Sequence, residues 1–190
     1  MTLDLNLEEV CTTLNEIMEY ELAGVVRYTH SSLMVVGPHR IPIVNFLQEQ
    51  ANETLQHAQQ AGELLTGLDG HPSQKIAKIV ETNNHSIKDI LEESLEHELH
   101  ALSLYKKLLS MVEGASIYLE EYTRNLIGQE EQHQLELRKM LKDFSEDPEV
   151  FSCTNPNKCL VLWKILRFSQ ASLNVCKSMY ILQENFLRLD

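Results

Sequence analysis

The sequence predicts an all-α protein in which two helical hairpins, joined by a long crossover, form a four-helix bundle that a C-terminal helix follows. Apolar residues recur at three- and four-residue spacing over four long stretches, and no stretch alternates as a strand would. The 7 glycines and 5 prolines mark boundaries more than they interrupt these patterns. With 190 residues, 43% of them hydrophobic, the chain suffices for one substantial core. We therefore expect residues 1–144 to form the bundle and residues 145–190 to form a linker and an amphipathic helix.

The first predicted hairpin comprises two helices separated by the segment GPHRIP. The helix over residues 7–35 has a stripe of apolar side chains at helical spacing: Val10, Leu14, Ile17, Met18, Leu22, Val25 and Tyr28. The stripe of the second helix runs through Ile43, Phe46, Leu47, His57, Ala61, Leu64 and Leu65. The segment TGLDGHPS closes this helix because it combines turn-forming residues with a proline.

A connection over residues 66–86 leads to the second hairpin, and it is long enough to travel the length of a bundle. Ser86 and Asp89 have the spacing of a capping box, which predicts that a third helix begins there. Gly114 is expected to break this helix, and a fourth is expected from about Ser116 to Phe144. Beyond it, Asp147-Pro148 and Asn155-Pro156 suggest an extended link into a last helix over about 159–186.

Charge, cysteine usage and hydropathy limit the function classes. The net charge of −12 argues against a nucleic-acid partner and would draw cations towards the protein. The four cysteines show neither metal-type pairing nor the density of a disulfide scaffold, so we expect reduced thiols. The first residues are acidic where a signal peptide would be basic, and no apolar run is long enough to span a membrane. We therefore expect a soluble, cytoplasmic protein.

Two glutamates occupy positions where a core leucine would be ordinary. Glu21 belongs to the apolar stripe of the first helix, and Glu98 lies among the apolar residues of the third. An isolated buried carboxylate costs several kcal/mol or takes up a proton, so inward glutamates require partners. Each is followed seven residues later by a tyrosine, Tyr28 and Tyr105 respectively. We treat Tyr105 as an ordinary core aromatic.

The other two helices supply suitable partners. Glu130 and His133 stand three residues apart on one face of the fourth helix. The second helix has His57 on its inner stripe and Glu53 four residues before it. Glu21 precedes His57 by 36 residues and Glu98 precedes His133 by 35, so the chain resembles one helical hairpin repeated.

Together these four glutamates and two histidines predict a metal site at the centre of the bundle. Four negative charges match two divalent cations, and mixed carboxylate and imidazole ligands suit iron or manganese. A single glutamate in a helical stripe is commonly a boundary residue, and one Glu-x-x-His is common by chance, but six such residues in a twofold repeat favour a metal site. His97 and His100 lack the four-residue spacing of a helical zinc pair and are expected to flank the site helix without binding metal. Histidines near helix ends or in loops are expected to be solvated: His30, His39, His71 and His85.

The segments YELAGVVRY, ETLQHA, HELHALSLY and GQEEQHQLE together resemble the bacterioferritins, within the ferritin-like superfamily, over about residues 5–144. The resemblance implies a bundle whose di-iron centre oxidises Fe(II) with oxygen or peroxide, and that assembles as a homo-oligomer, in many members a cage that stores ferric mineral. It implies Glu21 and Glu98 as terminal carboxylate ligands, Glu130 as a bridge, and His57 and His133 as further ligands. Tyr28 matches a tyrosine near that centre, and is the catalytic candidate.

The chain departs from the family pattern on the second helix. The residue three before His57 is Thr54, where the family has a bridging glutamate. Glu53 lies next to it, and positions three and four before a histidine lie about 60° and about 40° to either side of it around a helix. We expect Glu53 to approach the site as a sixth metal ligand. Leu55 stands where the family's haem-binding methionine would be, so we predict no haem.

Three functional hypotheses remain open from the sequence. The leading one is a ferroxidase that binds two iron ions per chain, with a role in iron storage or detoxification. The second is a di-manganese catalase or another di-metal oxidase on the same bundle. The third is a structural or binding bundle without metal, which Thr54 supports. A rubrerythrin-like peroxidase is disfavoured, because the chain has no pair of Cys-x-x-Cys motifs for a rubredoxin iron.

Overall fold

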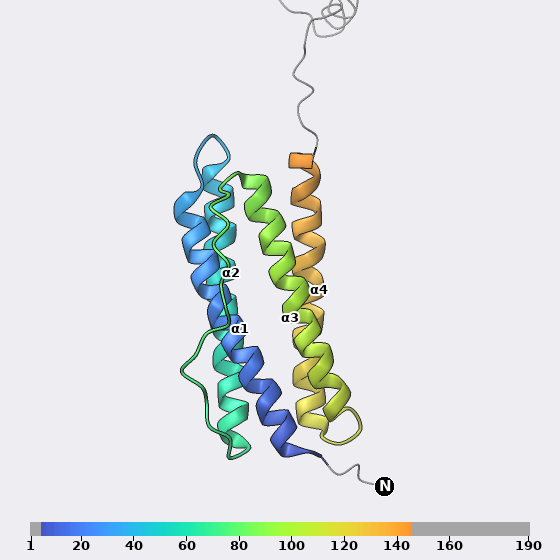
Figure 1. Ribbon diagram of the computed structural model, residues 1–190. Helices are drawn as coiled ribbons and strands as arrows, with labels where there is room; N and C mark the ends of the chain where they lie inside the picture. The colour runs from blue at the N-terminus through green and yellow to red at the C-terminus, as the bar shows by residue number, and fades with distance from the viewer. Residues whose placement is uncertain (1–4, 146–190) are drawn as a thin grey trace, which may run out of the picture. The chain divides into compact units, whose positions relative to one another are not determined.

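The computed structural model describes residues 5–145, which form four α-helices, the first and fourth running in one direction along the bundle and the second and third in the other (Figure 1). The helices are α1 (Leu7–Met34), α2 (Arg40–Gly67), α3 (Ile87–Val112) and α4 (Ile117–Ser145). No strand occurs within the described range, which confirms the predicted all-α class. None of these four helices is long and apolar enough to cross a membrane. The predicted C-terminal helix lies outside the described residues.

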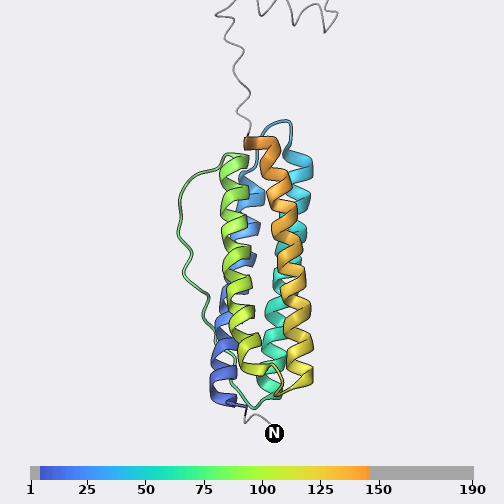
Figure 2. The same ribbon diagram turned by 90° about the vertical axis from the view of Figure 1, so that its right-hand side faces the viewer.

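Helices α1 and α2 form one antiparallel hairpin, and α3 and α4 form the other. The crossover, residues 68–86, runs along the side of the bundle from one end to the other (Figure 2). Hydrogen bonds hold it on α1: the Asn15 Oδ1 accepts from the Ser73 N–H at 2.8 Å, and the Glu19 carbonyl accepts from the Ala77 N–H at 2.9 Å. The crossover thereby returns the chain to the other end of the bundle, as the sequence predicts.

The helix ends follow the local signals in the sequence. The Ser86 side chain accepts a hydrogen bond from the Asp89 N–H at 3.1 Å, so this predicted cap is present. Gly114, two residues after the end of α3, has a φ of +72°, a left-handed conformation that glycine adopts without steric cost. Helix α2 begins at Arg40, so Pro42 lies in its first turn, where the backbone N–H of a helix has no intrahelical acceptor.

The interior contains two apolar clusters with a polar layer between them. One cluster includes Leu14, Leu65, Leu108 and Leu126, and the other includes Leu47 with further apolar residues towards the opposite end of each helix. Between these clusters, each of the four helices contributes buried polar side chains: Glu21, Thr54, His57, Glu98, Glu130 and His133. The polar layer is therefore enclosed by apolar packing above and below.

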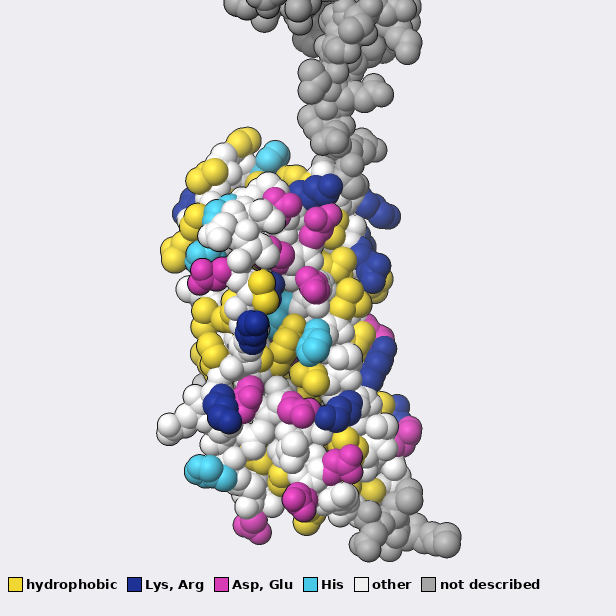
Figure 3. Space-filling model, viewed as in Figure 1, with side chains coloured by type: hydrophobic (Ala, Val, Ile, Leu, Met, Phe, Trp, Pro, Cys, Tyr) yellow, Lys and Arg dark blue, Asp and Glu magenta, His cyan; other side chains and the backbone are white. Residues whose placement is uncertain are grey.

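Charged side chains of both signs are spread among apolar ones over the face of the bundle seen in Figure 3. The net charge of the chain is therefore not gathered into a single acidic patch on that face. The acidic side chains that matter most for chemistry are those buried inside the bundle.

Candidate metal centre

The polar layer brings together carboxylates and imidazoles from all four helices. The residues Glu21, Glu98 and Glu130 are at most 3% exposed, and His57 and His133 are also buried. Water cannot solvate carboxylates in such a place, so protons, hydrogen bonds or cations must compensate their charge.

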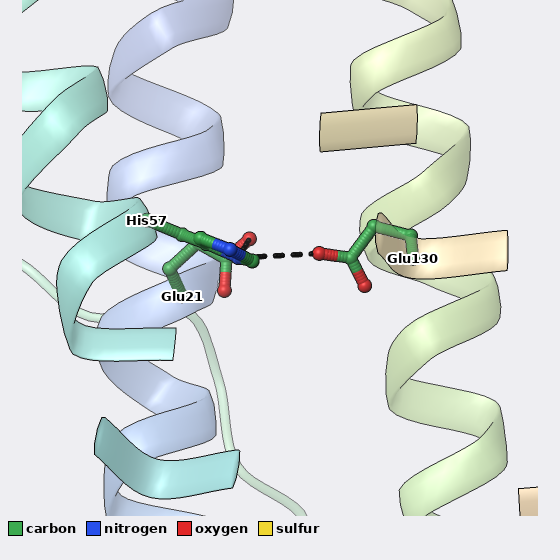
Figure 4. Close-up of side chains that lie close together, drawn as sticks. All are labelled: Glu21, His57 and Glu130. Atoms are coloured by element: carbon green, nitrogen blue, oxygen red, sulfur yellow. Dashed lines mark ion pairs between the residues drawn. The ribbon is translucent and has the colours of Figure 1, made fainter. Parts of the chain in front are cut away.

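The first group of potential ligands consists of Glu21 of α1, His57 of α2 and Glu130 of α4 (Figure 4). The His57 Nδ1 lies 3.2 Å from the Glu130 Oε1 and 3.7 Å from the Glu21 Oε1. One atom from each residue lies within 4.8 Å of the others, so the group could hold one metal ion.

The second group consists of Glu98 of α3 together with Glu130 and His133 of α4. The His133 Nδ1 lies 3.2 Å from the Glu98 Oε2 and 3.9 Å from the Glu130 Oε2. Glu130 therefore faces one histidine with each of its two oxygens, which is the arrangement required of a carboxylate that bridges two ions.

Two tyrosines hold the terminal carboxylates across the bundle. The Tyr28 hydroxyl donates a hydrogen bond to the Glu98 Oε1, and the Tyr105 hydroxyl donates to the Glu21 Oε1 at 2.8 Å. Each tyrosine thus donates a hydrogen bond to the glutamate of the other hairpin. Tyr105 lies in the apolar core, as expected from the sequence, but its hydroxyl also bonds to a site glutamate, which the sequence-based interpretation did not predict. The repeated spacing of glutamate and tyrosine was the signal that could have found this role.

The buried charges shift one another's pKa. Burial alone would lower the pKa of His57, but its hydrogen bonds with Glu130 and Glu21 raise it to about 10. Burial also opposes protonation of His133, yet Glu130 and Glu98 raise its pKa to about 10.

The pKa values of the carboxylates shift in opposite directions. Burial raises the pKa of Glu21 and of Glu98, whereas hydrogen bonds from His133 and His57 outweigh burial and lower the pKa of Glu130. Without metal, the two imidazoles therefore carry the compensating positive charge, and a divalent ion would displace their protons.

Glu53 lies beside the site but in neither group. Its Oε2 is 3.2 Å from the Nε2 of His133, on the side of the ring away from the other carboxylates, and its side chain is 37% exposed. Thr54 is buried and faces Gly24, so it offers no carboxylate in place of the missing bridge. The sequence-based prediction that Glu53 coordinates metal is not tested by these contacts, which equally allow Glu53 to act on the ligand His133.

The remaining histidines lie apart from both ligand groups. The ring of His97 is buried and stacks on Tyr20, with 4.5 Å between the ring centroids. Neither of its ring nitrogens has a hydrogen-bond partner within residues 5–145, and burial lowers its pKa to about 4, so the ring is neutral. His30, His39, His71 and His100 are exposed, and His85 is half-buried.

A cavity of about 250 Å³ lies between α1, α3 and the crossover. Tyr28 and His97 line it on the inner side, and residues 79–85 of the crossover line it on the outer side. Tyr28 lines this cavity and its hydroxyl bonds to Glu98, so one side chain of the lining contacts the second ligand group.

The donor set fits two divalent cations of the first transition series. Three buried carboxylates and two imidazoles are the mixed oxygen and nitrogen ligands that Fe²⁺ and Mn²⁺ accept, and the pair of groups shares one carboxylate. A carboxylate from each of two helices plus a Glu-x-x-His pair from each of the others is the arrangement known for di-metal helix bundles, and this chain has one such pair, Glu130 and His133 on α4.

Comparison with known proteins agrees with this fold. A family model described as "Ferritin-like domain" matches residues 11–146. A ferritin-like, diiron-carboxylate protein from Bacillus anthracis is 21% identical, with 73% of this chain and 99% of that chain covered and a TM-score of 0.68. The bacterioferritin-related dodecameric thioferritin from Bacteroides fragilis is 20% identical, with 78% and 93% covered and a TM-score of 0.72.

A third similar structure is a bacterioferritin from Rhodobacter capsulatus with a metal-free dinuclear site and haem iron. It is 22% identical, with 76% of this chain and 89% of that chain covered and a TM-score of 0.65. At these identities the likeness shows the fold. No curated protein matches the chain. Because the family match covers most of the chain and the four-helix architecture agrees with it, the chain belongs to the ferritin-like family.

Proposed function

We propose that this protein binds two Fe(II) ions per chain inside the bundle and oxidises them with oxygen or peroxide. The observation that supports this most directly is the pair of buried ligand groups that share Glu130. Glu21 and His57 would hold one ion, Glu98 and His133 the other, and Glu130 both.

The chemistry is electron transfer from bound substrate iron. Two Fe(II) ions give up two electrons to one oxygen molecule, which takes up two protons to form hydrogen peroxide. Bound in this way, the two ions would lie close enough together to reduce one molecule of oxidant. The protein contributes the geometry, neutralises charge with its three carboxylates, and excludes bulk water through its apolar clusters.

Tyr28 is not itself a ligand, because its hydroxyl bonds to Glu98, which belongs to the second ligand group. We therefore assign Tyr28 a positioning role. It would fix the rotamer of the Glu98 carboxylate while leaving one carboxylate oxygen to the metal. Tyr105 would do the same for Glu21 from the other hairpin.

We further propose a cytoplasmic homo-oligomer that stores or detoxifies iron. The dodecameric state of the related thioferritin supports an assembly of this kind. Our prediction that haem is absent rests, as before, on Leu55.

The decisive experiment is anaerobic titration of metal-free protein with Fe(II), followed by admission of air while ferric absorbance is recorded. We expect two irons per chain and rapid oxidation. Binding of manganese with breakdown of hydrogen peroxide, but without iron oxidation, would favour the di-manganese catalase instead. Absence of metal binding would leave a structural bundle.

A further inference from the structure

The two site histidines present their ring nitrogens in the same way. Each directs Nδ1 towards the buried carboxylates and Nε2 towards a second residue on the facing helix. The Nε2 of His57 lies 3.0 Å from the Gln129 Oε1, and the Nε2 of His133 lies 3.2 Å from the Glu53 Oε2.

Glu53 and Gln129 hold equivalent places in the repeated hairpin. Gln129 is four residues before His133 on α4, and Glu53 is four residues before His57 on α2. Each contacts the histidine of the other helix, so the two contacts are reciprocal. Thr54, not Glu53, occupies the place that corresponds to the shared carboxylate Glu130.

An acceptor on Nε2 determines how a histidine binds metal. An imidazole that donates its Nε2 proton keeps the Nδ1 lone pair free for an ion, and its ring orientation is fixed. The two acceptors differ in charge, since Gln129 offers a neutral amide oxygen and Glu53 offers a carboxylate. A hydrogen bond to a charged acceptor is about twice as strong as a neutral one, and it makes the imidazole a better donor to the metal.

We infer that Glu53 and Gln129 are positioning residues whose difference in charge makes the two metal positions unequal, with the ion at Glu98 and His133 bound more tightly than the ion at Glu21 and His57. This inference rests on the proposed function only in requiring that both groups bind divalent cations. It does not require that the cations be oxidised.

The test is anaerobic titration of metal-free protein with Co(II), in which binding is measured by calorimetry and by the visible absorbance of the bound ion. The unmodified chain should bind two ions in two resolved steps. The first step should disappear in His133→Ala, and the second in His57→Ala, which assigns each step to its group.

Glu53→Gln should still bind two ions but weaken the first step by about 10- to 100-fold, so that the two steps merge. Gln129→Glu should strengthen the second step, because it gives His57 a charged acceptor as well. Glu49→Gln removes the same charge from an exposed position one turn earlier on α2, and it should leave both steps unchanged.

Three results would overturn the inference. Loss of one whole equivalent of Co(II) in Glu53→Gln would show that Glu53 is a ligand. Unchanged steps in a folded Glu53→Gln variant would show that it has no part in binding. Equal weakening of the first binding step by Glu49→Gln would show that the effect comes from the overall charge of the chain and not from the contact with His133. Failure of the unmodified chain to bind Co(II) would instead contradict the proposed function itself.

Discussion

Glu130 offers one oxygen to each ligand group, so a single side chain connects the two metal positions. Changing it to glutamine should weaken both binding steps and slow Fe(II) oxidation by on the order of 100-fold or more, because a shared ligand matters at least as much as a residue behind a ligand. Stopped-flow absorbance after mixing with air-saturated buffer measures the rate.

The matched control for this change is Glu131→Gln, which alters the adjacent, exposed residue that pairs with Lys106 on the bundle surface. The control should bind and oxidise iron normally. If Glu130→Gln retained two tightly bound ions per chain, Glu130 would not be a bridge.

The tyrosine hydroxyls also act at this scale. Tyr105→Phe removes the hydrogen bond to the buried Glu21 and should lower the free energy of unfolding by about 1–3 kcal/mol. Chemical denaturation of the metal-free protein measures it. Tyr118→Phe, at an exposed position of α4, should have little effect. Equal losses in the two variants would mean that the Tyr105 hydroxyl contributes nothing specific.

At the scale of the elements, Gly24 permits α1 to pack closely against its neighbours. A Cβ at Gly24 would lie 2.4 Å from the His97 Nε2 and 2.7 Å from the Thr54 Cγ2, both on buried side chains of other helices. Gly24→Ala should therefore destabilise the protein by about 1–3 kcal/mol, as overpacking of a core does.

Gly128 of α4 provides the opposite case. A Cβ there would meet no described atom within 4 Å, so Gly128→Ala should stabilise the protein by about 0.5–1 kcal/mol through the helix propensity of alanine. Thermal unfolding of the two variants tests both signs together. Stabilisation by Gly24→Ala would show that His97 and Thr54 can move aside without cost.

The elements themselves were predictable because their signals are local. The cap at Ser86, the break at Gly114 and the apolar periodicity depend on residues within a few positions of one another, and all three appear where the sequence placed them. The start of α2 was less clear, because Pro42 resembles a breaker until the first turn of the helix is known to contain it.

At the scale of the whole molecule, the stability of the metal-free protein should fall as pH rises from about 7 to about 10. The pKa of His57 and of His133 is about 10 in the folded chain and near 6.5 in an unfolded one, so the folded state holds extra protons in this range. Their stabilising contribution is complete below about pH 6.5 and is lost as pH passes through the folded pKa.

The carboxylates that face these histidines also contribute to the pH dependence of stability. Glu21 and Glu98 have raised pKa values, so their contribution has the same sign: it is present at acidic pH and is lost as pH rises. Glu130, with a lowered pKa, contributes above its unfolded value and loses that contribution only in acid. Thermal midpoints across the pH range check this. A midpoint that rises from neutral to alkaline pH would contradict protonated histidines in the metal-free site.

Binding of divalent cations should restore much of the stability that the metal-free protein loses at alkaline pH, because the ions take the place of the protons on both imidazoles. Saturating Mn(II), added under anaerobic conditions, should raise the thermal midpoint most at alkaline pH. Calcium is the control, since it prefers oxygen ligands alone. Equal stabilisation by both ions would indicate binding at surface carboxylates.

The assembled state belongs to this scale as well. Light scattering combined with size-exclusion chromatography should give a homo-oligomer. A cage-sized particle would support mineral storage, whereas a stable monomer or dimer would leave iron oxidation without a storage cavity.

The sequence by itself determined the four helices, the hairpin repeat and the inward placement of Glu21, His57, Glu98, Glu130 and His133. Helical periodicity is a local property, so the face on which a side chain lies can be read from its neighbours. Only the tertiary structure decided that Glu53 meets the outer nitrogen of His133, that Gln129 does the same for His57, and that Tyr105 bonds to Glu21. These contacts join residues of different helices, and their distances depend on how the helices pack, which no local pattern specifies.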